Sequence, residues 1–304
     1  VLSSLLGRLS PPPAVAAPWG RCSVRVLSTD SLPGVARRAL STAYIGWSSS
    51  ITFATLGTAI TTLVLVPGLN VLFTVLLGAD LAANDTVRIG CASALIATLS
   101  SVAAGIVARV ATDRWIGVFE YVCTARPVDA GYWLGAAAVP ALLASVTGLS
   151  NVGIVWLLSL TAPSTGAASG LLIGAIALMP VAILGGVCLG IFAAGLGLYL
   201  SDPYTGSNVL SIVLPVSAGV IVPVSTYPAW LAWVCSWVPG SRLVQALDIS
   251  ALETPGSVSG GATQELFASL EADTALAVPY AAIGLGLTFL ATRRIRAGAR
   301  ASLL

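Results

Sequence analysis

Long uncharged stretches alternate with short charged segments along the chain. The stretches contain 41 residues after Arg38, 20 after Arg88, 72 after Asp129, 39 after Asp202 and 19 after Asp273. About 20 apolar residues suffice for a membrane-spanning helix. The 72-residue stretch therefore contains two, and we divide it at 159–170, a segment rich in turn formers. The pattern predicts six spans at roughly 51–78, 87–109, 132–158, 171–199, 206–225 and 274–292.

The composition agrees with a bilayer as solvent. Of the 304 residues 57% are hydrophobic and only 9% are charged, against roughly a quarter in an average soluble domain. We therefore expect an all-α integral membrane protein. A net charge of +2 gives no reason to expect a nucleic-acid partner.

The placement of arginine predicts the orientation, because cytoplasmic loops carry an excess of positive charge. With both termini cytoplasmic, 12 of the 14 arginines lie inside. Only Arg88 and Arg242 then lie outside, together with an acidic loop at 249–273. We expect a multi-pass protein of the cell membrane, with both termini in the cytoplasm.

Two N-terminal segments differ in character. Residues 1–31 contain three consecutive prolines and no continuous apolar core, so we expect a disordered cytoplasmic tail. Residues 32–48 mix apolar residues with Arg37 and Arg38 and end near Trp47. This mixture is typical of an amphipathic helix on the inner membrane interface, or else of an ordinary juxtamembrane segment.

The chain lacks the residues of common catalytic sites. It contains no Lys, which excludes a GxxxxGK[ST] nucleotide site, and no His. Its five Cys are scattered without a CxxC pattern, so we expect no metal site. The predicted span centres carry no ionisable residue, which argues against a proton-coupled transporter. We expect no enzyme activity in this chain, and an energy source outside the bilayer if it transports uphill.

Polar residues collect in the first predicted span. They would face a partner subunit or line a translocation path: Thr58, Thr62, Asn70 and Thr74. The GxxxG pattern at 186–190 predicts close helix packing in the fourth span.

The loop between spans two and three is charged and amphipathic. Residues 111–125 predict a short surface helix that ends at Pro127. Such a helix can lie on lipid or dock in a groove of a soluble partner.

The segment 223–248 is apolar but broken by Pro228 and Pro239. Trp230, Trp233 and Trp237 fall on one helical face, and Trp favours the membrane interface. We expect a re-entrant outer hairpin between spans five and six that acts as an outer gate, or else a passive interfacial anchor. A seventh span would move the arginine-rich C-terminus outside.

This combination resembles the membrane subunit of ABC-2 type (type V) ABC exporters, over about residues 32–300. The resemblance lies in the order of a charged loop, Asp113–Arg114, Gly117, Glu120–Tyr121 and Ala125–Val128, followed by the outer segment Pro228–Leu231 and Pro239. The charged loop departs from the family's commoner form, which has more charge before the glycine.

The resemblance implies a permease subunit whose coupling residues contact a separate ATP-binding subunit. These are Asp113, Arg114, Gly117, Glu120, Tyr121, Arg126 and Pro127. It also implies an outer gate formed by Pro228, Trp230, Trp233, Trp237 and Pro239.

The implied assembly holds a second permease chain, identical or related, in membrane lipid. ATP and Mg would bind only to the partner subunit. The short outer loops resemble actinobacterial drug, antibiotic or lipid exporters of the daunorubicin-resistance type, so an amphipathic cargo is expected. A polysaccharide or glycolipid exporter of the same fold remains an alternative, and so does a non-transporting scaffold or sensor subunit.

Overall fold

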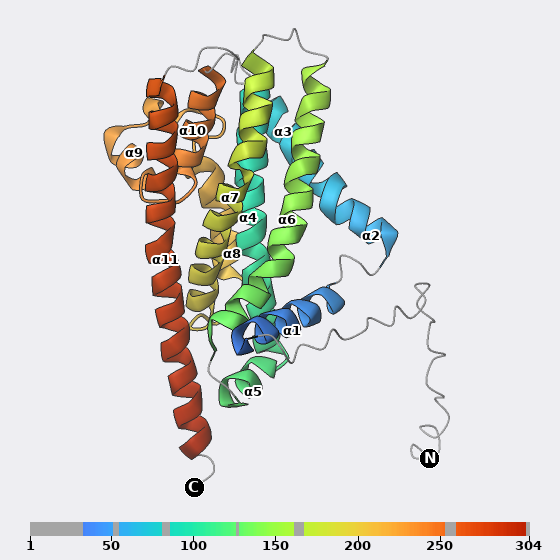
Figure 1. Cartoon of the computed structure of the whole chain (residues 1–304), viewed down its shortest axis with the longest axis vertical. Helices are drawn as coiled ribbons and strands as arrows, with labels where there is room; N and C mark the ends of the chain where they lie inside the picture. Colours follow the sequence, from blue (N-terminus) through green and yellow to red (C-terminus); the bar gives the residue numbers. More distant parts are fainter. Residues whose placement is uncertain are drawn as a thin grey trace, which may run out of the picture. The chain divides into compact units, whose positions relative to one another are not determined.

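The computed structural model describes residues 33–50, 55–80, 86–125, 128–160, 167–252 and 260–301, and these residues form helices and no strand (Figure 1). The predicted tail at 1–31 lies outside the described residues. The elements are α1 Gly34–Ser48, α2 Leu56–Ile60, the π-helix η3 Thr61–Leu65, α3 Val66–Asp80, α4 Thr86–Trp115, α5 Val118–Ala125, α6 Ala130–Ser159, α7 Ala167–Gly197, α8 Thr205–Ser217, the 3₁₀-helix η4 Val224–Thr226, α9 Ala229–Cys235, α10 Ser241–Leu252 and α11 Gly260–Ala301.

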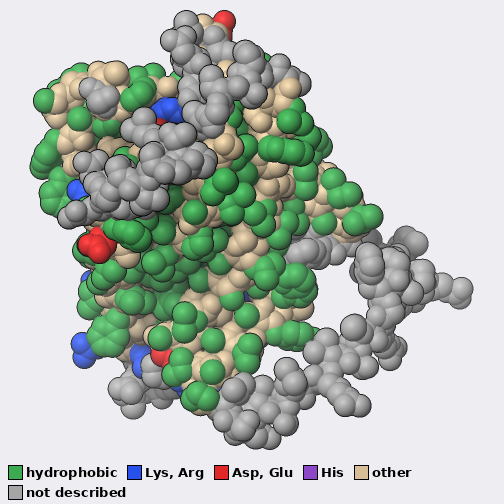
Figure 2. Space-filling view, turned by 45° about the horizontal axis from the view of Figure 1, so that its top comes forward, with side chains coloured by type: hydrophobic (Ala, Val, Ile, Leu, Met, Phe, Trp, Pro, Cys, Tyr) green, Lys and Arg blue, Asp and Glu red, His purple; other side chains and the backbone are tan. Residues whose placement is uncertain are grey.

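Five helical segments of the described chain are long and apolar enough to cross a membrane. They are Leu56–Gly78, Thr86–Trp115, Ala130–Ser159, Ala168–Gly197 and Phe267–Gly298. On the face in Figure 2, hydrophobic side chains cover most of the described surface and charged ones are few. An all-helical, multi-pass membrane protein is therefore confirmed, with five spans by length and composition.

The segment predicted as span five differs from a continuous spanning helix. Helix α8 has only 13 residues and is followed by Gly219 at φ 68°. Pro215 lies inside α8 and removes one helical hydrogen bond, and a left-handed glycine ends a helix readily. The single spanning helix predicted at 206–225 is therefore wrong. The chain forms α8, then a turn, and then the short helix η4.

Helix α4 lies at the centre of the bundle. In its most apolar window 67% of the residues are buried, against 17% for Leu56–Gly78. Helices α3, α6, α7 and α8 all pack against it. Two apolar clusters follow from this arrangement, one around Leu95 and Leu99 and the other around Ile106 and Val110.

Glycines bring the central helices together. A Cβ on Gly186 of α7 would lie 2.6 Å from the carbonyl oxygen of Leu99, and one on Gly190 would lie 3.0 Å from Cα of Ala103. Gly195 similarly faces Gly284 of α11. Only glycine allows this approach, which agrees with the packing expected of the GxxxG pattern.

The π-helix precedes Pro67 for a local reason. Pro67 has no N–H to donate to the carbonyl of Leu63, four residues earlier. Beside the widened turn at 61–65, the hydroxyl of Ser150 in α6 lies 3.1 Å from that carbonyl oxygen and 2.9 Å from the carbonyl oxygen of Thr147, so its one proton is shared between them. The first long apolar helix is thereby tied to α6.

One end of the bundle carries α1, α5 and the last turns of α11, and we call it the α1 end (Figure 1). Here α1 packs closely on α6, where a Cβ on Gly135 would lie 2.5 Å from the carbonyl oxygen of Ala39. Arg38 pairs with Asp129 at 2.5 Å. The apolar side chains of Leu40, Tyr44 and Trp47 remain exposed on α1. Whether α1 lies on a membrane interface stays a prediction.

The glycine packing makes a testable prediction. Gly186→Ala forces a methyl group against the α4 backbone and should lower the free energy of unfolding by about 1–3 kcal/mol. Gly153→Ala is the matched control, because no atom lies within 4 Å of its Cβ position. Thermal unfolding in detergent, followed by tryptophan fluorescence, measures both. Equal midpoints for the two variants would contradict close α4–α7 packing.

Candidate functional site

Helix α5 is a short helix folded back beneath the end of α4. Gly117 makes the turn between them at φ 75°, a conformation that residues with side chains rarely adopt. Phe119 and Cys123, one helical turn apart, face inward and are almost fully buried. The Phe119 ring meets that of Tyr132 edge-on at 6.4 Å. Arg296 of α11 donates from Nε to the carbonyl oxygen of Cys123 at 2.6 Å. These contacts hold α5 firmly against α6 and α11.

Two of the predicted coupling residues turn inward. Asp113 is 4% exposed, accepts a hydrogen bond from the Tyr132 hydroxyl at 3.2 Å and lies 3.4 Å from Arg109. Arg114 donates from Nη1 to the carbonyl oxygens of Gly197 and Leu200, at 2.6 and 2.8 Å. A cation at the last carbonyls of α7 stabilises that helix end. Asp113 and Arg114 therefore join helices of this chain to one another.

The remaining described coupling residues lie on an exposed surface. Glu120 and Tyr121 of α5 are exposed, Tyr121 to 78%. The same surface contains Trp115, exposed to 83%, Ile116 and Val118. We call these five residues the α5 surface. The sequence predicted Ile116 only as part of the amphipathic stretch and did not single out Trp115, although an apolar pair next to a turn glycine in a charged loop is a usable signal. Arg126 and Pro127 lie outside the described residues.

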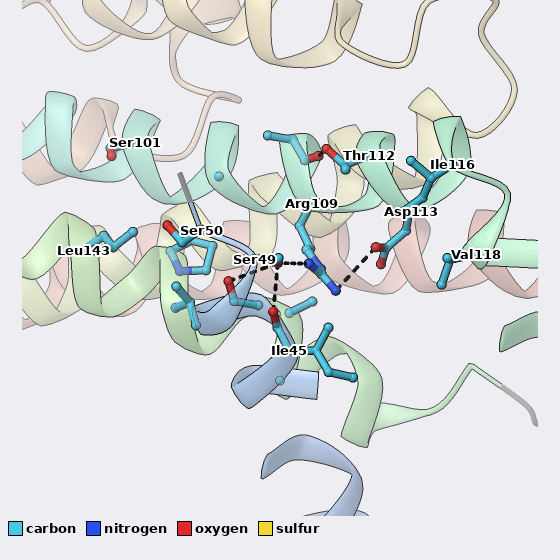
Figure 3. Close-up of a pocket in the computed structure, with 17 residues that line it drawn as sticks. Ile45, Ser49, Ser50, Ser101, Arg109, Thr112, Asp113, Ile116, Val118 and Leu143 are labelled. Carbon is cyan, nitrogen blue, oxygen red and sulfur yellow. Dashed lines mark hydrogen bonds and ion pairs between the residues drawn. The ribbon is translucent and has the colours of Figure 1, made fainter. Parts of the chain in front are cut away.

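A cavity of about 490 Å³ opens beside this surface, between α1, α4 and α6. Figure 3 shows Arg109 and Ser49 between its two ends. Leu143 and Ser101 lie at one end, and Asp113, Ile116 and Val118 at the other. Arg109 donates from Nη1 to the hydroxyl oxygen of Ser49 at 2.8 Å.

The segment predicted as the outer hairpin forms two short helices, α9 and α10, joined by a turn. Pro228 precedes the first residue of α9, and Pro239 lies in the turn. A Cβ on Gly240 in this turn would lie 3.1 Å from Cδ1 of Leu99 and 3.4 Å from Cδ1 of Ile96. Leu99 is about 20 Å along α4 from Thr86, at 1.5 Å per residue. The turn thus packs against the middle of α4.

Polar side chains of α11 bind the backbone of this turn. Asp273 is 2% exposed, and the N–H of Gly240 donates to its two carboxylate oxygens at 2.9 and 3.2 Å. The Tyr280 hydroxyl donates to the carbonyl oxygen of Trp237 at 2.9 Å. Asp273 therefore caps α10 from a neighbouring helix. The sequence placed Asp273 in an outer loop, whereas it lies inside α11, within the candidate span Phe267–Gly298.

The three predicted gate tryptophans lie on the surface of the hairpin. Trp230, Trp233 and Trp237 are exposed, and the rings of Trp233 and Trp237 meet edge-on at 6.0 Å. The far end of α10 is fixed to α4 by a bidentate pair, in which Arg88 donates to Asp248 at 2.7 and 2.9 Å. The hairpin is held at its turn and at its end, while its three tryptophans are each more than half exposed.

The proposed path residues satisfy their hydroxyls locally. Thr62 and Thr74 donate to the backbone carbonyls of Thr58 and Asn70, one turn earlier on their own helix. Asn70 is exposed. A path role for these four residues stays a prediction.

A buried amide in α6 escaped sequence reasoning. Asn151 is fully buried, and neither its amide nitrogen nor its oxygen has a hydrogen-bond partner among the described residues. Its position in a long apolar helix was the available signal. Among the described residues, no group of three His, Cys, Asp or Glu side chains could hold a metal ion.

Comparisons with protein-family models and with curated proteins found no match. The resemblance to ABC-2 permeases therefore rests on the sequence motifs.

The cap on α10 makes a prediction. Asp273→Ala leaves the buried N–H of Gly240 without its acceptor and should lower the free energy of unfolding by about 1–3 kcal/mol. Asp273→Asn keeps one acceptor oxygen and should lower it less. Glu271→Ala is the control, since Glu271 is exposed two residues earlier on the same helix. Thermal unfolding measures all three, and an unchanged midpoint for Asp273→Ala would contradict the cap.

A second prediction concerns the buried Cys123 thiol of α5. Burial raises the pKa of the Cys123 thiol from 9.0 to about 11, with Arg296 lowering it and Glu120 raising it. The thiolate fraction at pH 8 should be about a hundredfold below that of an unperturbed thiol, and alkylation correspondingly slow. Thr124→Cys places a thiol one residue further, on an exposed position, and should react rapidly. Iodoacetamide labelling of intact protein, read by mass spectrometry, compares the two. Equal rates would show that α5 does not bury Cys123.

Proposed function

We propose that this chain is the permease subunit of an ATP-driven exporter that moves an amphipathic small molecule, drug or lipid-like cargo out of the cell. The observation that carries the proposal is the α5 surface, an exposed aromatic patch at the charged end of a membrane bundle. Exposed hydrophobic side chains on the apolar spans have a simpler explanation, because lipid covers them. The resemblance to ABC-2 permeases points to the same surface as a coupling site.

The proposed topology has six crossings. Five are the long apolar helices. The additional crossing, fifth along the chain, consists of α8 and the segment after it, which joins the two ends of the bundle. Gly206 packs against Ala193 near the end of α7, and the carbonyl oxygen of Val220 lies 3.5 Å from Nη1 of Arg88. Thirteen helical residues cover about 20 Å, and the turn after Gly219 continues to Val220 beside Arg88.

The charge distribution supports a cytoplasmic α1 end. Arginines of the described helices collect there: Arg37, Arg38, Arg109, Arg114, Arg293, Arg294 and Arg296. Only Arg88 and Arg242 lie in the other half of the described chain. This asymmetry agrees with the positive-inside rule, and six crossings would put both termini in the cytoplasm.

Energy coupling requires a partner. These 304 residues contain no Lys and so hold no P-loop lysine, and we assign ATP binding to a partner subunit. A partner ATPase would bind ATP and Mg and contact the α5 surface. Movement of α5 would pass directly to α6 and α11, through the Phe119–Tyr132 contact and the Arg296 hydrogen bond. Asp113 and Arg114 would act as positioning residues behind the surface.

The hairpin α9–α10 suits an outer gate in this scheme. Its turn reaches the middle of α4, and its broken backbone is satisfied by Asp273 and Tyr280. Irregular backbone at such depth is tolerated where protein side chains replace water. A gate lined by Trp needs no charge, since it can close by excluding water. A second permease chain would supply the other half of the path.

The experiment is purification of the tagged chain from its native membrane, followed by identification of co-purifying proteins and measurement of ATP hydrolysis. We expect a P-loop ATPase to co-purify with the wild-type chain. Glu120→Arg and Tyr121→Ala should weaken this association about tenfold or more, since exposed aromatic residues are frequent interface hot spots.

Tyr44→Ala is the matched control, because Tyr44 is an exposed tyrosine on α1 at the same end. It should leave association and hydrolysis unchanged. If no ATPase co-purifies with the folded wild-type chain, the exporter proposal is wrong and a scaffold or sensor function takes its place. If an ATPase binds equally to all variants, the α5 surface is not the docking site.

A further inference from the structure

The cavity between α1, α4 and α6 has a polar part and an apolar part. The polar part holds the guanidinium of Arg109, the hydroxyls of Ser49 and Thr112, and the carboxylate of Asp113. The more apolar part is lined by Val139, Pro140 and Leu143 of α6, together with Ser50 and Ser101. Its volume of about 490 Å³ falls within the range of small-molecule sites, roughly 300–1,000 Å³.

Arg109 has unused hydrogen-bonding capacity. A guanidinium offers five donors. One donor of Arg109 reaches Ser49, while the Nη2 nitrogen lies 3.4 Å from Asp113, longer than a typical charge-assisted hydrogen bond of 2.7–2.9 Å. The Nε atom is buried and has no hydrogen-bond partner among the described residues. The two terminal nitrogens, which contact the cavity residues Ser49 and Asp113, keep further N–H donors that an oxyanion would accept.

Asp113 does not use up the hydrogen-bond donors of Arg109. Its Oδ2 atom accepts from the Tyr132 hydroxyl at 3.2 Å, which draws the carboxylate toward α6. Thr112 donates to the carbonyl of Ala108, and Ser49 to that of Ile45, so both hydroxyl oxygens retain only acceptor capacity toward the cavity. Arg109 is therefore the donor that selects the ligand charge.

The apolar part extends away from Arg109 along α4. Ser101 lies eight residues before Arg109, which is about 12 Å along a helix. Figure 3 shows Ser101 and Leu143 at this far end. A ligand that fills the cavity needs a charged head at Arg109 and a hydrocarbon tail against α6.

We propose that this cavity binds one single-chain anionic amphiphile, with its phosphate or carboxylate head on Arg109 and its tail against Val139, Pro140 and Leu143. This binding does not depend on the proposed exporter function. Both a resident membrane lipid and a transported cargo have the required chemistry.

The test uses the full chain in phosphatidylcholine nanodiscs and dodecyl phosphate with a photoactivatable diazirine in its tail. Crosslinking followed by mass spectrometry should place the adduct on the cavity segments 101–112 and 135–143. The uncharged dodecyl glycerol ether with the same diazirine is the matched probe, and it should crosslink there about tenfold less.

Two variants test separately the contact of the ligand's charged head and the contact of its hydrocarbon tail. Arg109→Gln removes the charged donor, and Leu143→Trp fills the apolar end while leaving Arg109 and its partners in place. Each should reduce the cavity adduct about tenfold or more. Arg37→Gln, at an exposed arginine of α1, should leave it unchanged. Thermal unfolding of every variant verifies that it is folded.

An adduct spread over the lipid-facing helices, equal adducts with both probes, or an adduct unchanged in both cavity variants would each overturn the proposal. Two results that support it distinguish the sources. A native anionic lipid that co-purifies with the wild type and is lost in Leu143→Trp identifies a resident lipid. Stimulation of ATP hydrolysis in the assembled complex by dodecyl phosphate, absent in Leu143→Trp, identifies the cargo class. A chain without an ATPase partner that still gives the cavity adduct would overturn the exporter proposal alone.

Discussion

The burial of α4 imposes the main physical constraint on this molecule. A 30-residue helix surrounded by other helices can carry charge only near its ends, and α4 does so, with Arg88 near one end and Arg109, Asp113 and Arg114 near the other. Each of these charges is paired or binds a backbone carbonyl. Small residues along the middle allow α7 to approach closely. The hairpin α9–α10 is fixed at one end of this helix, and α5 and the cavity are formed at the other.

Backbone satisfaction explains how the chain departs from straight helices inside the bundle. Pro67 leaves a carbonyl that Ser150 binds, and the turn at Gly240 presents an N–H that Asp273 binds. Tyr280 binds a further carbonyl of the same hairpin. In an apolar solvent each unpaired group would cost several kcal/mol, as cyclohexane transfer indicates. These side chains therefore determine where non-helical backbone can occur.

Five of the six predicted spans correspond to long apolar helices, because spanning length and charge exclusion are local properties that the charge gaps record. The end of α8 was harder to predict, since it depends on Gly219 taking a left-handed conformation. Whether Asp113 and Arg114 face a partner or this chain depends on how the end of α4 meets α6 and α7, which no local pattern records. The spacing of the three tryptophans predicted a shared helical face; all three are exposed, but α9 ends at Cys235, before Trp237. Asp273 was misplaced because an acidic residue next to a polar segment has the pattern of a loop, whereas a backbone N–H from another helix allows it inside α11.

The account depends on the α1 end facing the cytoplasm, because both the α5 surface and the amphiphile cavity are assigned to that side. The most direct measurement is cysteine accessibility in cells, with single cysteines introduced by Tyr121→Cys or Trp237→Cys after replacement of the five native cysteines. With a membrane-impermeant maleimide, the account predicts labelling at position 237 in intact cells and labelling at position 121 only after permeabilisation. Labelling of position 121 in intact cells, with position 237 protected until permeabilisation, would contradict the account.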